Sequence, residues 1–194
     1  MVYTLEGTLT HRGDHFLVIK TGGIGFKVFT NERTLAHAPN EGNETKLFCH
    51  LHVREDQLDL YGFFEEGALK LFEFLVSVSG VGPKTALAVL DVDTVEHVMA
   101  AIINKQIEVL ARASGIGKKT AERIVLELHN RIVLPKGKAE AMGEAVGANL
   151  EIEEALAGLG YARSEIRKVL SGIGSEVTTL EERLRQALRT LGKK

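Results

Sequence analysis

An eight-residue segment occurs twice in this chain, and this duplication constrains the fold more than any other feature. Residues 79–86 (SGVGPKTA) and 114–121 (SGIGKKTA) are identical at six of eight positions and begin 35 residues apart. In both copies, apolar residues at helical spacing precede and follow the glycines. The repeat therefore predicts two copies of one unit, in which a tight turn joins two helices.

The Gly-apolar-Gly sequence of each copy favours contact with phosphate. Glycine permits a positive φ and has no Cβ, so the N–H groups that begin the second helix can approach a phosphate oxygen. Basic side chains beside the turn add charge that contacts a nucleic-acid backbone without reading bases. A purely structural turn is the alternative, but such a turn does not require the lysine that both copies share. The candidate phosphate-binding residues are Gly80, Gly82, Lys84, Gly115, Gly117, Lys118, Lys119 and Arg123.

The first 63 residues have a different periodicity, with alternating apolar residues in five short segments. Gly13 and the pair Gly22-Gly23 lie between segments, where hairpin turns require a positive φ. Five short antiparallel strands in this length predict a small barrel of the OB type, with an SH3-like barrel as the alternative.

Helical periodicity begins after the fifth predicted strand and stops at Pro135. Residues 136–149 contain Gly, Ala and charged residues but few bulky apolar ones, which predicts a flexible linker. Three amphipathic stretches follow and predict a three-helix, UBA-like domain with a marginal core, suited to docking. The expected fold class is multidomain α+β, with domains at 1–63, 64–135 and 150–194 and the linker at 136–149.

Composition and charge exclude several classes of protein. The chain has 194 residues, one Cys and no Trp, which excludes a disulfide-built scaffold and a zinc site made of cysteine pairs. No signal peptide or membrane-spanning stretch is recognisable, so we expect a cytoplasmic protein. The net charge is −2, but residues 63–138 carry 10 basic and 9 acidic residues. A positive field therefore belongs to the middle of the chain.

Neither repeat fits a P-loop or a dinucleotide-binding glycine motif. His50 and His52 share one strand face and form a candidate metal site, but ordinary strand histidines are the favoured interpretation. Cys49 has no catalytic context. We therefore expect no catalytic residue, no metal and no cofactor. Two other functions stay open at this point: a nuclease or glycosylase that holds its substrate with the hairpins, and a scaffold without affinity for nucleic acid.

Several separate stretches resemble the RuvA family, the Holliday-junction-binding subunits of the bacterial branch-migration machinery. The resemblance covers essentially the whole chain and implies homotetramers that hold an open, square-planar four-way DNA junction, with one or two tetramers on each junction. The implied partners are the RuvB hexamer, an ATPase that pumps the duplex arms, and the RuvC resolvase. The stretches are VRED (53–56), LYGF (60–63), the two glycine hairpins and ALAGLGY (155–161).

The resemblance also implies roles for particular residues. The hairpin residues named above would grip phosphates of the arms. Glu55 and Asp56, beside Arg54, match an acidic pin whose carboxylates repel phosphates at the junction centre; a solvated acidic turn and a magnesium-binding nuclease pair are the alternatives. Four apolar residues match positions that contact RuvB, with core packing as the alternative. They are Leu156, Leu159, Tyr161 and Leu188.

Overall fold

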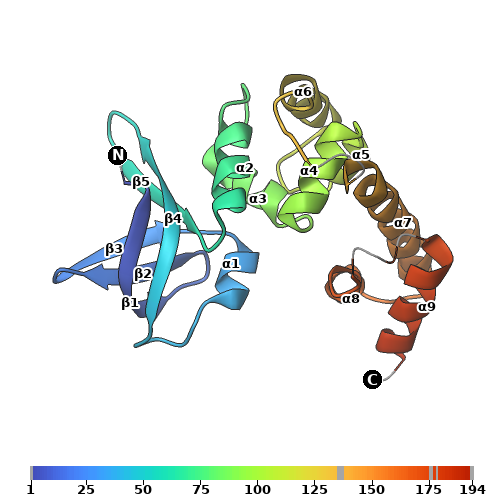
Figure 1. Cartoon of the computed structure of the whole chain (residues 1–194), viewed down its shortest axis with the longest axis horizontal. Coiled ribbons are helices and arrows are strands. Elements are labelled where there is room, and N and C mark those ends of the chain that lie inside the picture. The colour runs from blue at the N-terminus through green and yellow to red at the C-terminus, as the bar shows by residue number, and fades with distance from the viewer. Residues whose placement is uncertain (1, 135–137, 175–176, 178, 193–194) are drawn as a thin grey trace. The chain divides into compact units, whose positions relative to one another are not determined.

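The computed structural model describes residues 2–134, 138–174, 177 and 179–192. The chain divides into two compact units, Met1–Asp91 and Val92–Lys194 (Figure 1). The first unit contains the strands β1 (Thr4–Arg12), β2 (Phe16–Thr21), β3 (Ile24–Phe29), β4 (Glu44–Val53) and β5 (Leu58–Phe63), and the helices α1 (Glu32–His37), α2 (Glu66–Val76) and α3 (Pro83–Leu90). The second contains α4 (Val95–Ile103), α5 (Ile107–Leu110), α6 (Lys118–Leu128), α7 (Lys138–Gly158), α8 (Arg163–Ser171) and α9 (Leu180–Leu191). None of the helices described is long and apolar enough to span a membrane.

The five strands close into a barrel in the order β1-β2-β3-β5-β4. Neighbouring strands are antiparallel except β3 and β5, which are parallel. The helix α1 connects β3 to β4. This arrangement is the five-stranded Greek-key barrel of the OB type, so the barrel predicted from the alternating pattern is confirmed.

Alternation along the strands decides which side chains fill the barrel. Leu17 and Ile19 of β2 have no exposed surface, whereas the alternate residues Phe16 and Val18 are partly exposed. Cys49 of β4 also belongs to this core, where burial raises the pKa of its thiol to about 11. The thiol is therefore protonated at neutral pH and is not a reactive thiolate.

The glycines between the first three strands are required for two different reasons. Gly22 and Gly23 have φ values of 55° and 84°, as predicted for a two-residue hairpin turn between β2 and β3. Gly13 does not have a positive φ, so that part of the prediction is wrong. A Cβ at Gly13 would lie 2.3 Å from the ring of Phe16. Glycine allows the Phe16 ring to lie directly against the backbone, and any other residue would require that ring to move.

Helices α2 and α3, which flank the first hairpin, belong to the barrel unit. Phe72 of α2 is fully buried, and its ring stacks on Tyr61 of β5 with 5.2 Å between centroids. Burial also raises the pKa of Tyr61 to about 12. At the end of α3, Asp91 accepts a hydrogen bond from the Arg33 N–H of α1 at 3.3 Å. These contacts fix the first hairpin to the barrel.

The longest helix, α7, organises the second unit. Val146 in its first half packs with Ala101 of α4 and Val109 of α5. Ile152 and Leu156 in its second half belong to a core shared with α8 and α9. The three-helix domain predicted at the C-terminal end is therefore confirmed, with α7 as its first helix.

The predicted flexible linker, residues 136–149, differs from the structure, because residues 138–149 form the first half of α7. Residues 136 and 137 lie outside the described part. Met142, Val146 and Asn149 are buried at helical spacing, and a Cβ at Gly143 would lie 2.4 Å from the Asn104 amide nitrogen. Alanine, glutamate and lysine are good helix formers, and α4 supplies the apolar surface that makes the helix favourable.

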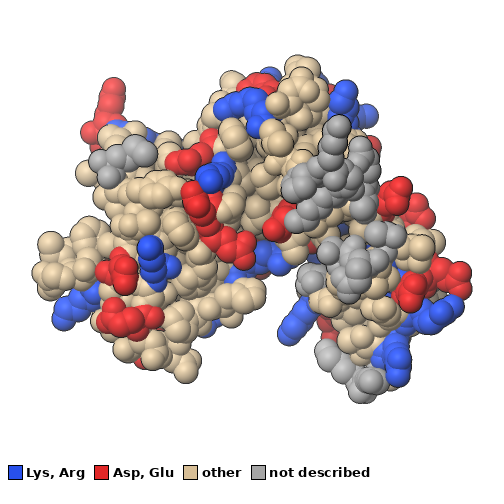
Figure 2. Space-filling view, viewed as in Figure 1, with Lys and Arg blue, Asp and Glu red and all other residues tan. Residues whose placement is uncertain are grey.

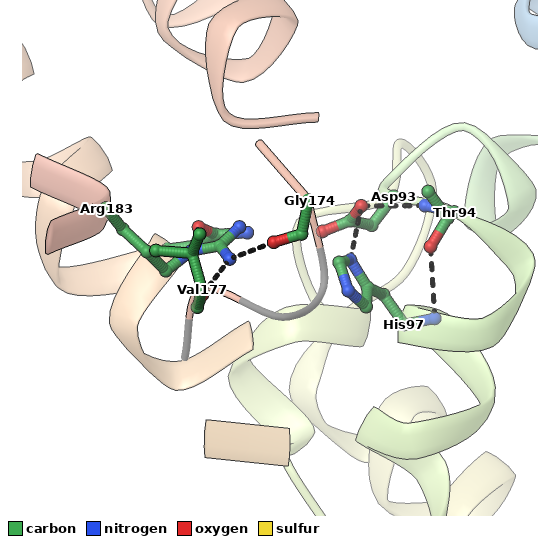
Figure 3. Close-up of polar contacts among 7 residues, drawn as sticks. Asp93, Thr94, His97, Gly174, Val177 and Arg183 are labelled. Atoms are coloured by element: carbon green, nitrogen blue, oxygen red, sulfur yellow. Dashed lines mark hydrogen bonds and ion pairs between the residues drawn. The ribbon is translucent and has the colours of Figure 1, made fainter. Parts of the chain in front are cut away.

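Two polar networks fix the ends of helices in this unit (Figure 3). Asp93 accepts from the Thr94 N–H at 2.7 Å and contacts His97 Nδ1 at 2.9 Å, which holds the start of α4. Arg183 of α9 is fully buried and donates to the Asn149 side chain at 2.8 Å and to the carbonyls of Gly174 and Val177. The guanidinium thus ties α9 to α7 and to the loop after α8.

Candidate nucleic-acid interface

The two glycine hairpins have the same backbone geometry. The first glycine is left-handed in both, with a φ of 85° at Gly80 and 80° at Gly115. The apolar residue that follows, Val81 or Ile116, is buried, and its N–H donates to the carbonyl three residues earlier at 3.1 Å. The predicted repeat of helix, tight turn and helix is therefore confirmed.

The second glycine of each hairpin, Gly82 or Gly117, is the N-cap of the following helix. Its φ and ψ are −87° and 170° in the first hairpin and −90° and 170° in the second. Any residue adopts such an extended conformation, and a Cβ at either position would meet nothing within 4 Å. Neither conformation nor internal packing requires glycine there. The open space instead leaves the helix N-terminus accessible to a ligand.

The helices behind these glycines offer N–H groups to such a ligand. Neither α3 nor α6 has a side-chain cap hydrogen bond or an acidic residue in its first turn. The first N–H groups and the positive end of each helix dipole are therefore available to an anion. The helices differ at their first residue, since Pro83 has no N–H whereas Lys118 has one.

The predicted basic residues are divided unequally between the two hairpins. Lys118, Lys119 and Arg123 are exposed on α6 beside the second hairpin, and Figure 2 shows Lys and Arg side chains gathered around that helix. Lys84 is exposed beside the first hairpin, in the other unit. Each hairpin thus combines a helix N-terminus with at least one exposed cation, and the second carries more charge.

The acidic pin predicted at Glu55 and Asp56 lies at the tip of the β4–β5 hairpin, where the Arg54 N–H donates to the Gln57 carbonyl at 2.9 Å. Both carboxylates are exposed, and acidic side chains project at this end of the barrel in Figure 2. Within the described residues neither carboxylate has a hydrogen bond or ion pair. The Arg54 guanidinium donates to the His52 ring at 3.1 Å instead. The tip therefore presents two carboxylates without a paired cation.

An apolar pair at the base of this tip is exposed, which was not predicted from the sequence. Val53 and Leu58 are cross-strand partners and are 64% and 70% exposed. They continue the alternation of β4 and β5 beyond the core, so the sequence gives no sign that they are exposed.

The two strand histidines already have protein partners. His50 contacts Glu73 of α2 at 3.2 Å, and His52 accepts from Arg54. In the described part of the chain, no group of three or more His, Cys, Asp or Glu side chains is placed to hold a metal ion.

The four apolar residues predicted to contact a partner separate into two groups. Leu156 has no exposed surface and belongs to the three-helix core, because it follows Ile152 by one helical turn. Tyr161 packs partly against the same core. Leu159 and Leu188 are 72% and 39% exposed. The structure therefore leaves Leu159 and Leu188 as the surface candidates and places Leu156 inside the domain.

A buried ionic group beside the second hairpin was also missed. Glu153 of α7 is 2% exposed and forms ion pairs with Arg112, which precedes that hairpin, and with Arg163 and Arg167 of α8. Burial first, and then the neighbouring Arg167, lower the pKa of Arg112. Arg112 and Glu153 are far apart in sequence, so only the fold of the second unit reveals the pair.

Comparison with known proteins gives matches along almost the whole chain. Three family models match: RuvA N terminal domain at residues 1–62, SAM-like helix-hairpin-helix tandem at 72–130, and RuvA C-terminal domain at 148–192. Similar curated proteins carry the name Holliday junction branch migration complex subunit RuvA. The one from Chloroflexus aggregans is 42% identical over 99% of both chains. The one from Salinispora arenicola is 43% identical over 100% of this chain and 99% of its own, and the one from Dehalococcoides mccartyi is 40% identical over 100% of both.

Proposed function

The chain belongs to the RuvA family, and we propose on this premise that it is a non-catalytic subunit that binds four-way DNA junctions for branch migration. In this role it holds the junction open and recruits an ATPase motor, RuvB, that moves the arms during recombination and repair.

One observation carries the DNA-binding proposal: the open space in front of Gly82 and Gly117. Both residues have a backbone that any amino acid adopts, yet both are glycine and both precede a helix N-terminus without a cap. A phosphate oxygen that accepts from these N–H groups explains the choice, because a side chain would block its approach. Exposed lysines next to both glycines support the same ligand. The contacts involve only backbone phosphates and are independent of base sequence.

The acidic tip gives this binder its preference for a junction. A carboxylate pair without a bound cation repels phosphates, so a continuous duplex cannot lie across Glu55 and Asp56 at low cost. In a tetramer with four-fold symmetry, four such pairs would surround the centre. Strands that leave the centre in four directions avoid this repulsion, and those of a linear duplex do not.

The C-terminal domain provides the contact with the motor. Leu159 and Leu188 are exposed apolar side chains on the three-helix domain, and both match apolar positions that the family uses to contact RuvB. We assign RuvB to this surface. One or two tetramers on each junction, and a role for the RuvC resolvase on the same DNA, are further parts of the proposal.

A gel-shift titration tests the proposal. The protein is titrated onto a synthetic four-way junction and onto a linear duplex of the same arm sequence, with magnesium present and ATP absent. We expect strong, uncut binding of the junction and much weaker binding of the duplex. Equal affinity for both DNAs would reduce the protein to a general DNA binder, and product bands that Glu55→Gln abolishes would make it a nuclease.

A further inference from the structure

Two aromatic rings and a lysine form a patch on the outer face of β2 and β3. Phe16 and Phe29 are directly opposite each other in the antiparallel pair, and both rings are partly exposed. The Lys27 ammonium lies 4.3 Å from the centroid of the Phe16 ring and 4.9 Å from that of Phe29. We call these three residues the outer aromatic patch. None of them takes part in the two glycine hairpins (residues 79–86 and 114–121) or in the acidic tip.

The rings of this patch are held in place from behind. Gly13 lies directly under the Phe16 ring, since a Cβ there would be 2.3 Å from it. The Phe29 ring packs on Tyr61 with 5.7 Å between centroids, and Tyr61 stacks on the buried Phe72. The backing fixes the ring orientations while leaving part of each ring at the surface. A fixed aromatic surface loses little conformational entropy when a flat ligand stacks on it.

The combination of flat rings and a cation selects one kind of ligand. An unpaired nucleotide offers a base that stacks on a phenylalanine ring and a phosphate that pairs with an ammonium group. Paired DNA keeps its base faces inside the helix, so it can use the lysine but not the rings. The same face of an OB-type barrel, strands 2 and 3, is a general site for oligonucleotides.

We propose that the outer aromatic patch binds unpaired DNA nucleotides: the Lys27 ammonium moves from the ring faces to a phosphate, and bases take its place on Phe16 and Phe29. The inference deepens the proposed function, because a junction that is held open and driven by a motor exposes unpaired nucleotides. The barrel would then interact with DNA in two ways. Its acidic tip repels phosphates, and its outer aromatic patch holds bases.

Fluorescence anisotropy of the full chain with a labelled oligothymidine of about 12 nucleotides, a length within the usual range for one such barrel, tests this site. A junction with fully paired arms is titrated in parallel. We expect F16L/F29L to weaken oligothymidine binding about tenfold and to leave paired-junction affinity within about twofold, because the hairpins make the phosphate contacts. K27Q should lower the salt dependence of oligothymidine binding by about 0.7 in the log–log slope.

Two controls separate stacking from folding. Phe48, with Lys46 5.8 Å from its ring centroid, is a similar pair on β4, so F48L should leave oligothymidine affinity unchanged. F16Y/F29Y restores aromatic rings and should restore the affinity that F16L/F29L loses. The thermal unfolding of each variant shows whether the barrel is intact.

The outcomes also separate this inference from the proposed function. A wild-type protein that binds the junction but not oligothymidine overturns the outer aromatic patch alone. The same holds if F16L/F29L binds oligothymidine as well as wild type, or if F48L weakens binding equally. Failure of the wild-type protein to bind the junction overturns the proposed function, and the oligothymidine titration then still decides whether the patch binds unpaired DNA.

Discussion

The hairpin between α2 and α3 and the hairpin between α5 and α6 have first glycines with φ values of 85° and 80° and second glycines that agree within a few degrees. Their surroundings differ. The first is built on the barrel, has Pro83 at the first helical position and carries Lys84. The second is built on helices and carries Lys118, Lys119 and Arg123.

Each hairpin is also held by a buried or half-buried carboxylate from a different source. Asp91 at the end of α3 accepts a hydrogen bond from the backbone of α1 in the barrel unit. Glu153 of α7 pairs with Arg112, just before the second hairpin, and with two arginines of α8. Local sequence therefore determines hairpin geometry, whereas the charge and the anchoring of each hairpin come from the unit around it.

Removal of the second anchor should have the largest effect. Glu153→Ala leaves the arginines around a buried site without their carboxylate, and breaking a buried ion pair from one side costs about 3 kcal/mol. Urea denaturation should show this loss. Amide hydrogen exchange should speed up in residues 107–128 and not in 66–90, because only the second unit contains Glu153. Glu151→Ala, an exposed position on the same helix, is the control. Equal acceleration in both hairpins would show that Glu153 does not anchor the second hairpin specifically.

The charge difference between the hairpins should appear in DNA affinity. Lys118→Ala with Lys119→Ala should weaken junction binding about 30-fold and lower the salt slope by about two, whereas Lys84→Ala should lower that slope by about one. Gel-shift titrations at several salt concentrations measure both quantities. Lys46→Ala with Arg189→Ala removes two exposed cations elsewhere and should change affinity little. A loss with Lys84→Ala as large as that of the double variant would show that the hairpins contribute equally.

The two glycines of one hairpin should respond in opposite ways to alanine. Gly115→Ala forces a Cβ into the left-handed region and should cost about 1–2 kcal/mol of folding free energy. Gly117→Ala is free of that strain and should keep the wild-type melting temperature, yet weaken junction binding about tenfold because the methyl group blocks the N–H groups. Gly80→Ala and Gly82→Ala should repeat this pattern in the first hairpin. Unchanged affinity in Gly82→Ala and Gly117→Ala would remove the support for phosphate binding at these helices.

The smallest effect should come from the anchor of the first hairpin. Burial raises the pKa of Asp91, so the folded state binds more protons than the unfolded state between the unfolded and folded pKa values. Wild-type stability should therefore increase relative to Asp91→Asn as the pH falls through the folded pKa towards the unfolded one. At neutral pH the unfolding free energies of wild type and Asp91→Asn should agree within about 1 kcal/mol, because the asparagine side-chain oxygen can still accept the hydrogen bond from the Arg33 N–H. Urea denaturation at several pH values checks both statements, and the opposite pH trend would contradict the assigned shift.

The parts of the molecule that follow local rules were predictable from the sequence. The hairpins follow from glycines at fixed spacing, and the barrel from alternation and a Gly-Gly turn. The first half of α7 was not predictable, because this part of the helix depends on contact with α4. Residues 138–149 contain only two bulky apolar side chains, Met142 and Val146, that could have indicated such a contact. Gly13 is a similar case, since the ring that packs against it belongs to the next strand.

The candidate site was predicted in its residue types and only partly in its arrangement. Both glycine pairs precede helix N-termini and have exposed lysines beside them, while phosphate binding at these positions stays a prediction. Leu156 was assigned to a partner surface, but it lies one helical turn after Ile152, so both side chains point into the core. The pairing of Arg112 with Glu153 depends on where α7 lies, and charged residues of this kind occur throughout the chain. A pair of this kind is recognised only in the folded structure, where the two residues lie together.

The continuity of α7 has a mechanical consequence. A helix of 21 residues is a stiff rod about 31 Å long, and one end of this rod is seated on α4 and α5 while the other forms part of the three-helix domain. A force on that domain is therefore transmitted along the helix, whereas a flexible linker would absorb it. A load applied at the C-terminal domain therefore reaches the helices that carry the second hairpin.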